Sequence, residues 1–214
     1  MNIHSKIPKL LAGVATVAVA GVLSIALPTA AQQAAPTPGT FLGAVLISDD
    51  AEAAGDFYAA IFGWDMEQAK DGGFAVRHKG QMIAGISPVQ PSNDDFDEST
   101  WLVGLMVEDI DRSLESAAKN KATIHEKVER VSDYGRFAVV ADRQGAPLLL
   151  IEPGLKPLGR GRDHGSWVWA ELWTNDVKDA VAFYTEVVGV GHGTTDRGGQ
   201  DYHYFSSQAV SYTH

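Results

Sequence analysis

The sequence predicts an α+β fold built from repeated strand–helix–three-strand units. The first observation is a repeated phrase: DFYAAIFGWDME at 56–67 and AFYTEVVGVGHG at 182–193 each place a glycine five residues after Phe-Tyr. The second is a set of three aspartates, Asp50, Asp109 and Asp176, each directly before a run with helical spacing, where aspartate is a common helix cap. Such self-similarity along a chain indicates repeated structural units.

Composition limits the classes of protein to which the chain can belong. Its 214 residues are 45% hydrophobic, which is enough for a packed core and for one or two domains. The formal net charge of -10 excludes nucleic acid as an expected partner, because nucleic-acid binding needs a basic surface. The absence of cysteine excludes disulfides and thiolate metal sites.

Residues 1–31 have the layout of a bacterial export signal. Lys6 and Lys9 precede an uncharged apolar run at 10–27, and small residues before Gln32 suit cleavage at that point. We therefore expect a periplasmic or secreted protein that has no contact with the membrane once the signal is removed. An uncleaved membrane anchor is the alternative, because about 18 apolar residues are borderline for spanning a bilayer. Residues 32–40 are expected to form a flexible lead-in.

The first unit is expected to begin with a strand, and its helix should start after Asp50 and end at Gly63, because glycine favours helix C-termini. The expected strands are 41–47, 64–69, 74–78 and 81–87. The helix should bury one apolar face. That face comprises Ala54, Phe57, Tyr58, Ile61 and Phe62. On this prediction, Phe57→Ala lowers the free energy of unfolding by about 3–5 kcal/mol.

The second unit repeats this order after a polar loop, with a helix that starts after Asp109. Its expected strands are 101–107, 122–128, 136–142 and 147–151. Together the two units are expected to form one complete domain at 41–153. A glycine-rich linker follows at 154–166.

The third unit, 167–214, is expected to be the first half of a second domain that is truncated. WVWAELW at 167–173 has the alternation of a strand, and a helix should follow Asp176 and end at Gly189. The helix should bury Val177, Ala180, Val181, Tyr184 and Val188. Residues 191–199 are expected to form a glycine-rich turn, and 203–205 a short strand.

Several stretches together resemble the vicinal oxygen chelate superfamily, which includes glyoxalase I, bleomycin-resistance proteins and extradiol dioxygenases. They are SDDAEAAGDFYAAIFGW, TWLVGLMVEDIDRSL, GRFAVVADRQGAPLLLIEP and VWAELWTNDVKDAVAFY. The resemblance implies paired β-α-β-β-β units whose mixed sheet curls around a cleft. It also implies that, in metal-dependent members, His, Gln or Glu side chains on the first and last strands hold a divalent ion that acts as a Lewis acid.

The positions that this resemblance assigns to metal ligands hold no suitable side chain. Counting from the capping aspartates and from the turn glycine gives Gly43, Leu102, Trp169 and Leu149. None of these offers an oxygen, nitrogen or thiolate donor. We therefore predict no cofactor, and a divalent metal follows from family analogy alone. The histidines His78, His125, His192 and His203 are expected to be surface or packing residues.

The predicted pocket is an apolar cleft, which is the usual form of a small-molecule site. Its expected lining is Gly43, Val45, Ile47, Leu102, Gly104, Met106, Leu149 and Glu171. Glu171 is the one acid on its expected strand and shares a face with Trp169 and Trp173. A core filled by these same apolar side chains is the alternative. The opposite strand faces should pack on the helices, namely Leu42, Ala44, Leu46, Trp101, Val103, Leu105 and Val107.

Three functions fit the sequence, and none identifies catalytic residues. The first is an exported protein that binds a small apolar or aromatic molecule without a metal. The second is a metal-dependent enzyme of the glyoxalase or dioxygenase type whose ligands lie elsewhere. The third is a structural module that forms a homodimer.

Overall fold

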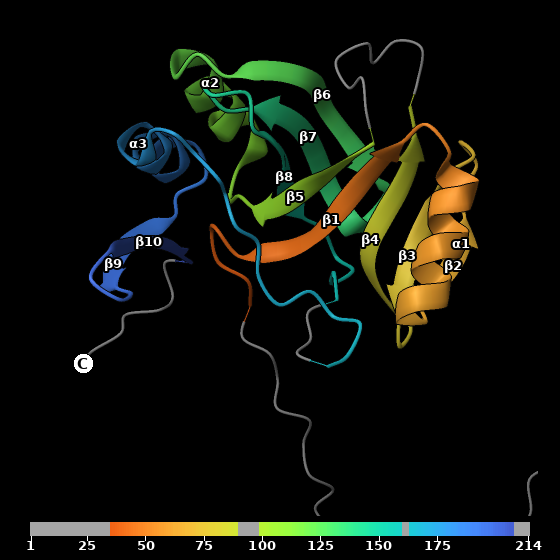
Figure 1. The fold of residues 1–214 in the computed structure, drawn as a ribbon. Helices are drawn as coiled ribbons and strands as arrows, with labels where there is room; N and C mark the ends of the chain where they lie inside the picture. Colours follow the sequence, from red (N-terminus) through yellow and green to blue (C-terminus); the bar gives the residue numbers. More distant parts are fainter. Residues whose placement is uncertain (1–34, 90–98, 160–162, 208–214) are drawn as a thin grey trace, which may run out of the picture. The chain divides into compact units, whose positions relative to one another are not determined.

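The computed structural model describes residues 35–89, 99–159 and 163–207, and for residues 126–132 it describes the backbone alone. The elements are β1 (Phe41–Ser48), α1 (Ala51–Phe62), β2 (Asp65–Gln68), β3 (Phe74–His78), β4 (Gln81–Pro88), β5 (Thr100–Met106), α2 (Ile110–Lys119), β6 (Thr123–Val131), a 3-10 turn (Ser132–Tyr134), β7 (Gly135–Ala141), β8 (Pro147–Pro153), α3 (Val177–Val187), β9 (Gly191–Asp196) and β10 (Asp201–Ser206). The predicted α+β class is confirmed (Figure 1). Within the described residues, no helix is long and apolar enough to cross a membrane. The predicted export signal lies outside those residues.

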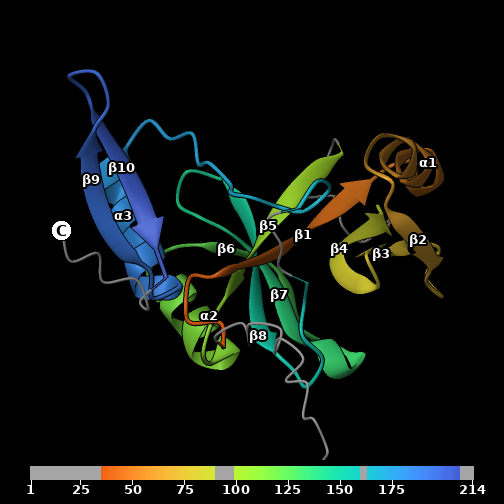
Figure 2. The same ribbon diagram turned by 90° about the horizontal axis from the view of Figure 1, so that it is seen from below.

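Eight strands form one mixed sheet, and its order repeats about its centre. The order is β2-β3-β4-β1-β5-β8-β7-β6, with β1 and β5 antiparallel in the middle. Each central strand then pairs in parallel with the last strand of its own unit, β1 with β4 and β5 with β8. The predicted pairing of two β-α-β-β-β units is therefore confirmed, and Figure 2 shows the sheet bending between its two halves. The domain limits at 41–153 and 154–166 stay a prediction.

The three helices begin where the capping aspartates predicted. The side chains of Asp50, Asp109 and Asp176 each accept a hydrogen bond from the backbone N–H three residues on, at 2.9–3.0 Å. Each bond satisfies one N–H group that has no partner inside the helix. At the other end of α1, Gly63 has a φ of 64°, a left-handed conformation that glycine adopts without strain.

The predicted buried face of α1 is partly wrong. Ala51 and Gly55 face the sheet, whereas Phe57 and Ile61 are exposed to 55% and 56%. A Cβ atom on Gly55 would lie 3.4 Å from the Phe74 ring, so a small residue lets this helix approach the sheet closely. The helix is therefore rotated away from the face that the spacing of its largest side chains indicated.

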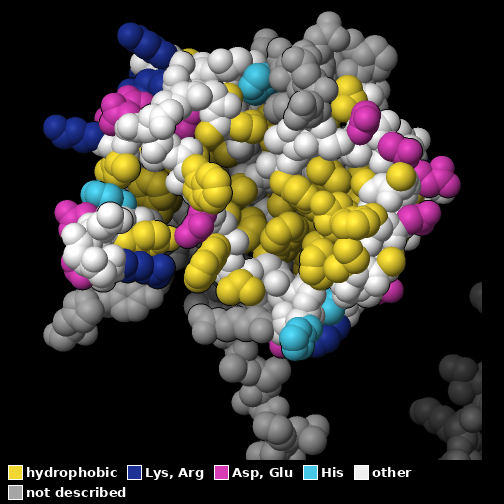
Figure 3. Space-filling model, in the orientation of Figure 1, with side chains coloured by type: hydrophobic (Ala, Val, Ile, Leu, Met, Phe, Trp, Pro, Cys, Tyr) yellow, Lys and Arg dark blue, Asp and Glu magenta, His cyan; other side chains and the backbone are white. Residues whose placement is uncertain are grey.

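Tyr58 does contribute to packing, as part of an aromatic cluster beside α1. Its ring contacts Trp64 and Trp101, and its hydroxyl accepts a hydrogen bond from the Trp101 Nε1–H at 2.9 Å. Trp167 closes the cluster by packing against Trp64 and Trp101, and its Nε1–H donates to the Ile83 carbonyl at 3.0 Å. Figure 3 shows hydrophobic side chains gathered over this part of the sheet.

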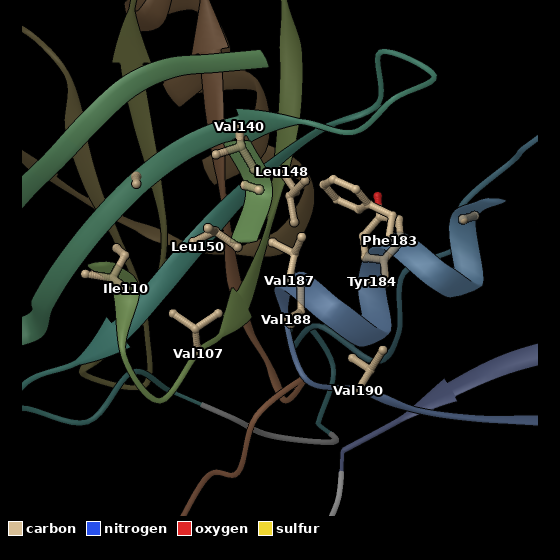
Figure 4. Packing of buried hydrophobic residues seen from close by; sticks show 13 residues of the cluster. Val107, Ile110, Val140, Leu148, Leu150, Phe183, Tyr184, Val187, Val188 and Val190 are labelled. Carbon is tan, nitrogen blue, oxygen red and sulfur yellow. The ribbon is translucent and has the colours of Figure 1, made fainter. Parts of the chain in front are cut away.

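α3 is part of the same core as the second unit. Phe183, Tyr184 and Val187 are buried against residues of β7, β8 and the α2 region, including Leu148 and Ile110 (Figure 4). Polar contacts hold the edges of this interface. They are Arg143 with Asp179, Ser116 with the Glu186 carbonyl, Asn120 with the Glu186 carboxylate, and the Tyr184 hydroxyl with the Asp142 carboxylate.

The buried face predicted for α3 was partly correct. Ala180, Tyr184 and Val188 are buried, but Val177 is 37% exposed. Phe183 and Val187, which the prediction left out, are buried instead. Burial also raises the pKa of the Tyr184 hydroxyl, because its charged form would lose hydration.

Two predictions about the third unit were wrong. Residues 167–173 form a coil, which Figures 1 and 2 draw leading from the large sheet toward α3. Alternating tryptophans favour a strand, but a strand also needs a neighbour to take its backbone hydrogen bonds. In the described residues the nearby strands β9 and β10 pair only with each other. Conversely, residues 191–196 form β9 rather than a turn, and the turn is confined to the residues before β10.

Candidate ligand-binding site

Five of the predicted pocket residues meet on the inner face of the large sheet. Val45, Ile47, Leu102, Met106 and Leu149 belong to one apolar cluster. The side chains at its centre are almost fully covered, with Leu102 1%, Leu149 5% and Ile47 8% exposed. The face is thus packed at its centre, as the alternative of a filled core describes. The assignment of these residues to a ligand pocket stays a prediction.

Gly43 and Gly104 pair across the two central strands, where neighbouring atoms leave no room for a side chain. A Cβ atom on Gly43 would lie 2.5 Å from the Ile83 carbonyl oxygen, and one on Gly104 would lie 2.6 Å from the Ile151 Cδ1 atom. These glycines therefore serve close packing.

The register shift beside Gly43 turns Leu42 to the inner cluster, which corrects the prediction that Leu42 packs on the helices. Leu46 and Val107 do pack on the helix side, as predicted.

Glu171, the eighth predicted pocket residue, lies in a different place. It lines a groove of about 710 Å³ between the coil at 169–174, the first turns of α3 and the β9–β10 hairpin. We call this the C-terminal groove. Trp169 and Trp173 line it as well, with exposures of 66% and 91%, together with the residues between them.

The polar groups of the C-terminal groove converge on Tyr202. The Tyr202 hydroxyl donates a hydrogen bond to Glu171 Oε1 at 3.0 Å, and this bond raises the pKa of Tyr202 by stabilising its protonated form. The Arg197 guanidinium carbon lies 4.1 Å from the centroid of the Tyr202 ring, which is a cation–π contact. Sequence reasoning missed Tyr202 and Arg197. The alternating DYHYF at 201–205 was the signal for this strand, but nothing local indicated its partner across the groove.

Two histidines form a bonded pair on the same hairpin. His192 Nε2 and His203 Nδ1 are 3.0 Å apart, the ring planes differ by 10°, and the centroids are 5.2 Å apart. The two nitrogens therefore lie between the ring centres in an N–H···N hydrogen bond, in which one ring must present a neutral nitrogen as acceptor. The prediction that they are surface residues agrees with their exposure.

The residues present do not fit a metal centre of the kind that the resemblance implies. The expected ligand positions hold Gly43, Leu102, Leu149 and Trp169, and the first three are packed into the core. No group of three His, Cys, Asp or Glu side chains with metal-binding geometry occurs among the described residues. Glu152, at the end of β8, accepts hydrogen bonds from the Ile110 N–H and from Arg136.

A second hollow differs from the C-terminal groove in the side chains that line it. It measures about 820 Å³, lies between α2 and α3, and is lined mainly by polar and charged side chains such as Glu108, Arg112 and Lys119. Small-molecule sites are usually lined by apolar and aromatic groups with few polar ones. The C-terminal groove matches that description better, so it is the candidate site.

One family model and two curated relatives show what the chain is similar to. The family model described as the Glyoxalase/Bleomycin resistance protein/Dioxygenase superfamily matches residues 40–150. A putative glyoxylase, CFP32 of Mycobacterium bovis, is 27% identical over 165 residues, which cover 73% of this chain and 63% of that protein. The anthracycline biosynthesis protein DauV of Streptomyces sp. strain C5 is 28% identical over 168 residues, covering 71% of this chain and 61% of that protein.

Solved structures share the fold. The Mn(II)-bound glyoxalase from Novosphingobium aromaticivorans aligns with a TM-score of 0.55 at 14% identity, covering 74% of this chain and 55% of that one. The chain spans less than two thirds of the length of the two curated relatives, CFP32 and DauV.

Proposed function

The chain belongs to the glyoxalase/bleomycin resistance protein/dioxygenase superfamily, and from this premise we propose that it binds a small aromatic molecule, without a metal ion, in the C-terminal groove. The observation that carries the proposal is the lining of that groove. The coil contributes Trp169 and Trp173, both exposed, and β10 contributes Tyr202, Tyr204 and Phe205. Aromatic walls bury a flat ring with large apolar area and favourable ring–ring geometry.

The name of one relative supports the choice of a flat aromatic ligand. DauV is an anthracycline biosynthesis protein, and anthracyclines are planar polycyclic aromatic compounds. Hydrogen-bonding groups at the groove, the Glu171 carboxylate and the Tyr202 hydroxyl, could orient the oxygen substituents of such a molecule. A metal is not part of the proposal, because the side chains at the family's ligand positions carry no donor atoms.

Fluorescence titration tests this proposal. We expect an anthracycline aglycone to quench tryptophan emission saturably, with a dissociation constant of about 10–100 μM, corresponding to about 5.5–7 kcal/mol for an open groove. Trp173→Ala should weaken binding about fivefold or more, because one aromatic wall is lost. Phe57→Ala is the matched control, since it removes an exposed aromatic side chain outside the groove.

Treatment with a chelator separates the proposal from its main alternative. Binding that is unchanged after EDTA, in protein with less than about 0.1 metal ion per chain, agrees with metal-free binding. Stoichiometric Mn, Fe, Ni or Zn whose removal abolishes a lyase or dioxygenase activity would instead identify a metal-dependent enzyme. Failure of the aglycone to bind would favour the structural module.

Export to the periplasm or the medium remains part of the proposed function. Its support is the basic start and apolar run at residues 1–31. N-terminal sequencing of protein purified from cells is expected to find Gln32 first, in the soluble periplasmic or secreted fraction. Recovery of Met1 in the membrane fraction would establish the uncleaved anchor.

A further inference from the structure

We infer that the ligand of the C-terminal groove carries a cationic amine beside its aromatic ring, and that Glu171 is the residue that selects the amine. The inference rests on the proposed function, because it concerns the same groove. It adds a charge requirement, which aromatic walls alone do not impose.

The first support is an available carboxylate. Within the described part of the chain, the Glu171 side chain has one hydrogen bond, from the Tyr202 hydroxyl, and no ion pair with lysine or arginine. Asp201 contributes a second carboxylate to the lining, which also holds Arg197 and the bonded pair His192 and His203. With the histidines counted as neutral, two carboxylates against one guanidinium leave the groove negative, in a chain whose formal net charge on the same basis is -10. This field attracts a cation and repels an anion.

The second support is a cation that the groove already holds. The Arg197 guanidinium lies over the Tyr202 ring at 4.1 Å, within the range at which a cation is attracted by the face of an aromatic ring. The groove offers further aromatic faces at Trp169 and Trp173, both exposed and both on the coil that carries Glu171. A ligand amine placed there would meet a carboxylate and an aromatic face together.

The geometry also explains why an amine suits the site better than a metal ion. The two neighbouring histidines direct their nitrogens at each other, 3.0 Å apart, and so bond each other. No third metal-ligating side chain joins them among the described residues. An ammonium group needs only hydrogen-bond acceptors and can use Glu171 without displacing the histidine pair.

A matched pair of probes tests the inference. 1-Naphthylmethylamine and 1-naphthylmethanol share ring and size and differ in charge near neutral pH. We expect the amine to bind wild-type protein about 5–10-fold more tightly, by tryptophan quenching at low ionic strength, with the preference falling as salt screens the carboxylates. Equal affinities for the two probes would overturn the inference while leaving the proposed function intact. If neither probe binds, both fail.

Substitutions then assign the selectivity to Glu171. Glu171→Gln keeps the size of the side chain and is expected to remove most of the preference for the amine while leaving affinity for the alcohol unchanged. Glu52→Gln, on the exposed face of α1, is the control and should change neither. Tyr202→Phe keeps the ring and removes the hydrogen bond that the tyrosine donates to the carboxylate, so the amine preference should persist or grow. Loss of the preference in Tyr202→Phe, with Glu171→Gln unchanged from wild type, would contradict the assignment.

Discussion

Replacing Phe183 by alanine is expected to lower the free energy of unfolding by about 3–5 kcal/mol, the usual range for a large aromatic side chain removed from a core. Phe183 has no exposed surface and lies in the cluster that joins α3 to β7, β8 and the α2 region (Figure 4). Its ring contacts Tyr184 edge-on at 5.3 Å, and the Arg143 guanidinium lies 6.0 Å from its centroid. Truncation would leave a cavity between helix and sheet.

Phe57 gives the matched control, because it occupies the same place in the repeated phrase. At 55% exposure, Phe57→Ala should cost less than about 1 kcal/mol, which corrects the value predicted from helical spacing. Urea denaturation of both variants, followed by circular dichroism, measures the difference. Equal losses at the two positions would contradict the burial described for α1 and α3.

Gly43→Ala is expected to lower the free energy of unfolding by about 2–4 kcal/mol. Gly43 has a φ of 140°, a conformation that costs other residues about 1–3 kcal/mol. The added Cβ would also lie 2.5 Å from the Ile83 carbonyl oxygen, and a backbone atom held by strand pairing cannot move aside as a side chain does. The substitution therefore strains the pairing of β1 with β4.

Gly80→Ala separates the two causes of that loss. Gly80 also has a positive φ, 78°, but no atom lies within 4 Å of the Cβ it would gain. It should therefore cost about 1 kcal/mol, for backbone strain alone. Thermal and urea unfolding of both variants would give the difference, which combines the collision with Ile83 and any extra backbone strain at the φ of 140°. If Gly43→Ala were no worse than Gly80→Ala, the close approach at Gly43 would be wrong.

Much of the fold could be predicted because its signals are local. Asp50, Asp109 and Asp176 cap helices with their own side chains, and Gly63 ends α1 through its own backbone freedom. The alternation of apolar residues in the first two units located their strands, because each strand has two faces that bury different sets of side chains. These effects depend on residues that are close in the sequence, so the sequence is enough to predict them.

The candidate site was less accessible to such reasoning. The sequence placed Glu171 beside Trp169 and Trp173, and these three do line one groove. It did not provide Tyr202 and Arg197. Tyr202 bonds Glu171 from a hairpin about thirty residues further along, Arg197 lies over the Tyr202 ring, and neither contact leaves a local pattern. For the inner face of the large sheet, the residues were predicted but their role was not. Its apolar residues were identified, but the sequence left open whether they form a cleft or a packed core.

The sequence by itself determined the order of strands and helix in the first two units and the starts of the three helices described in the structure. Tertiary structure decided which face of each helix is buried, because the same phrase is exposed at Phe57 and buried at Phe183. It also decided that 167–173 is a coil, because a strand exists only where a neighbour takes its hydrogen bonds. Burial and pairing depend on what lies opposite in space, and one short segment of sequence does not contain that information.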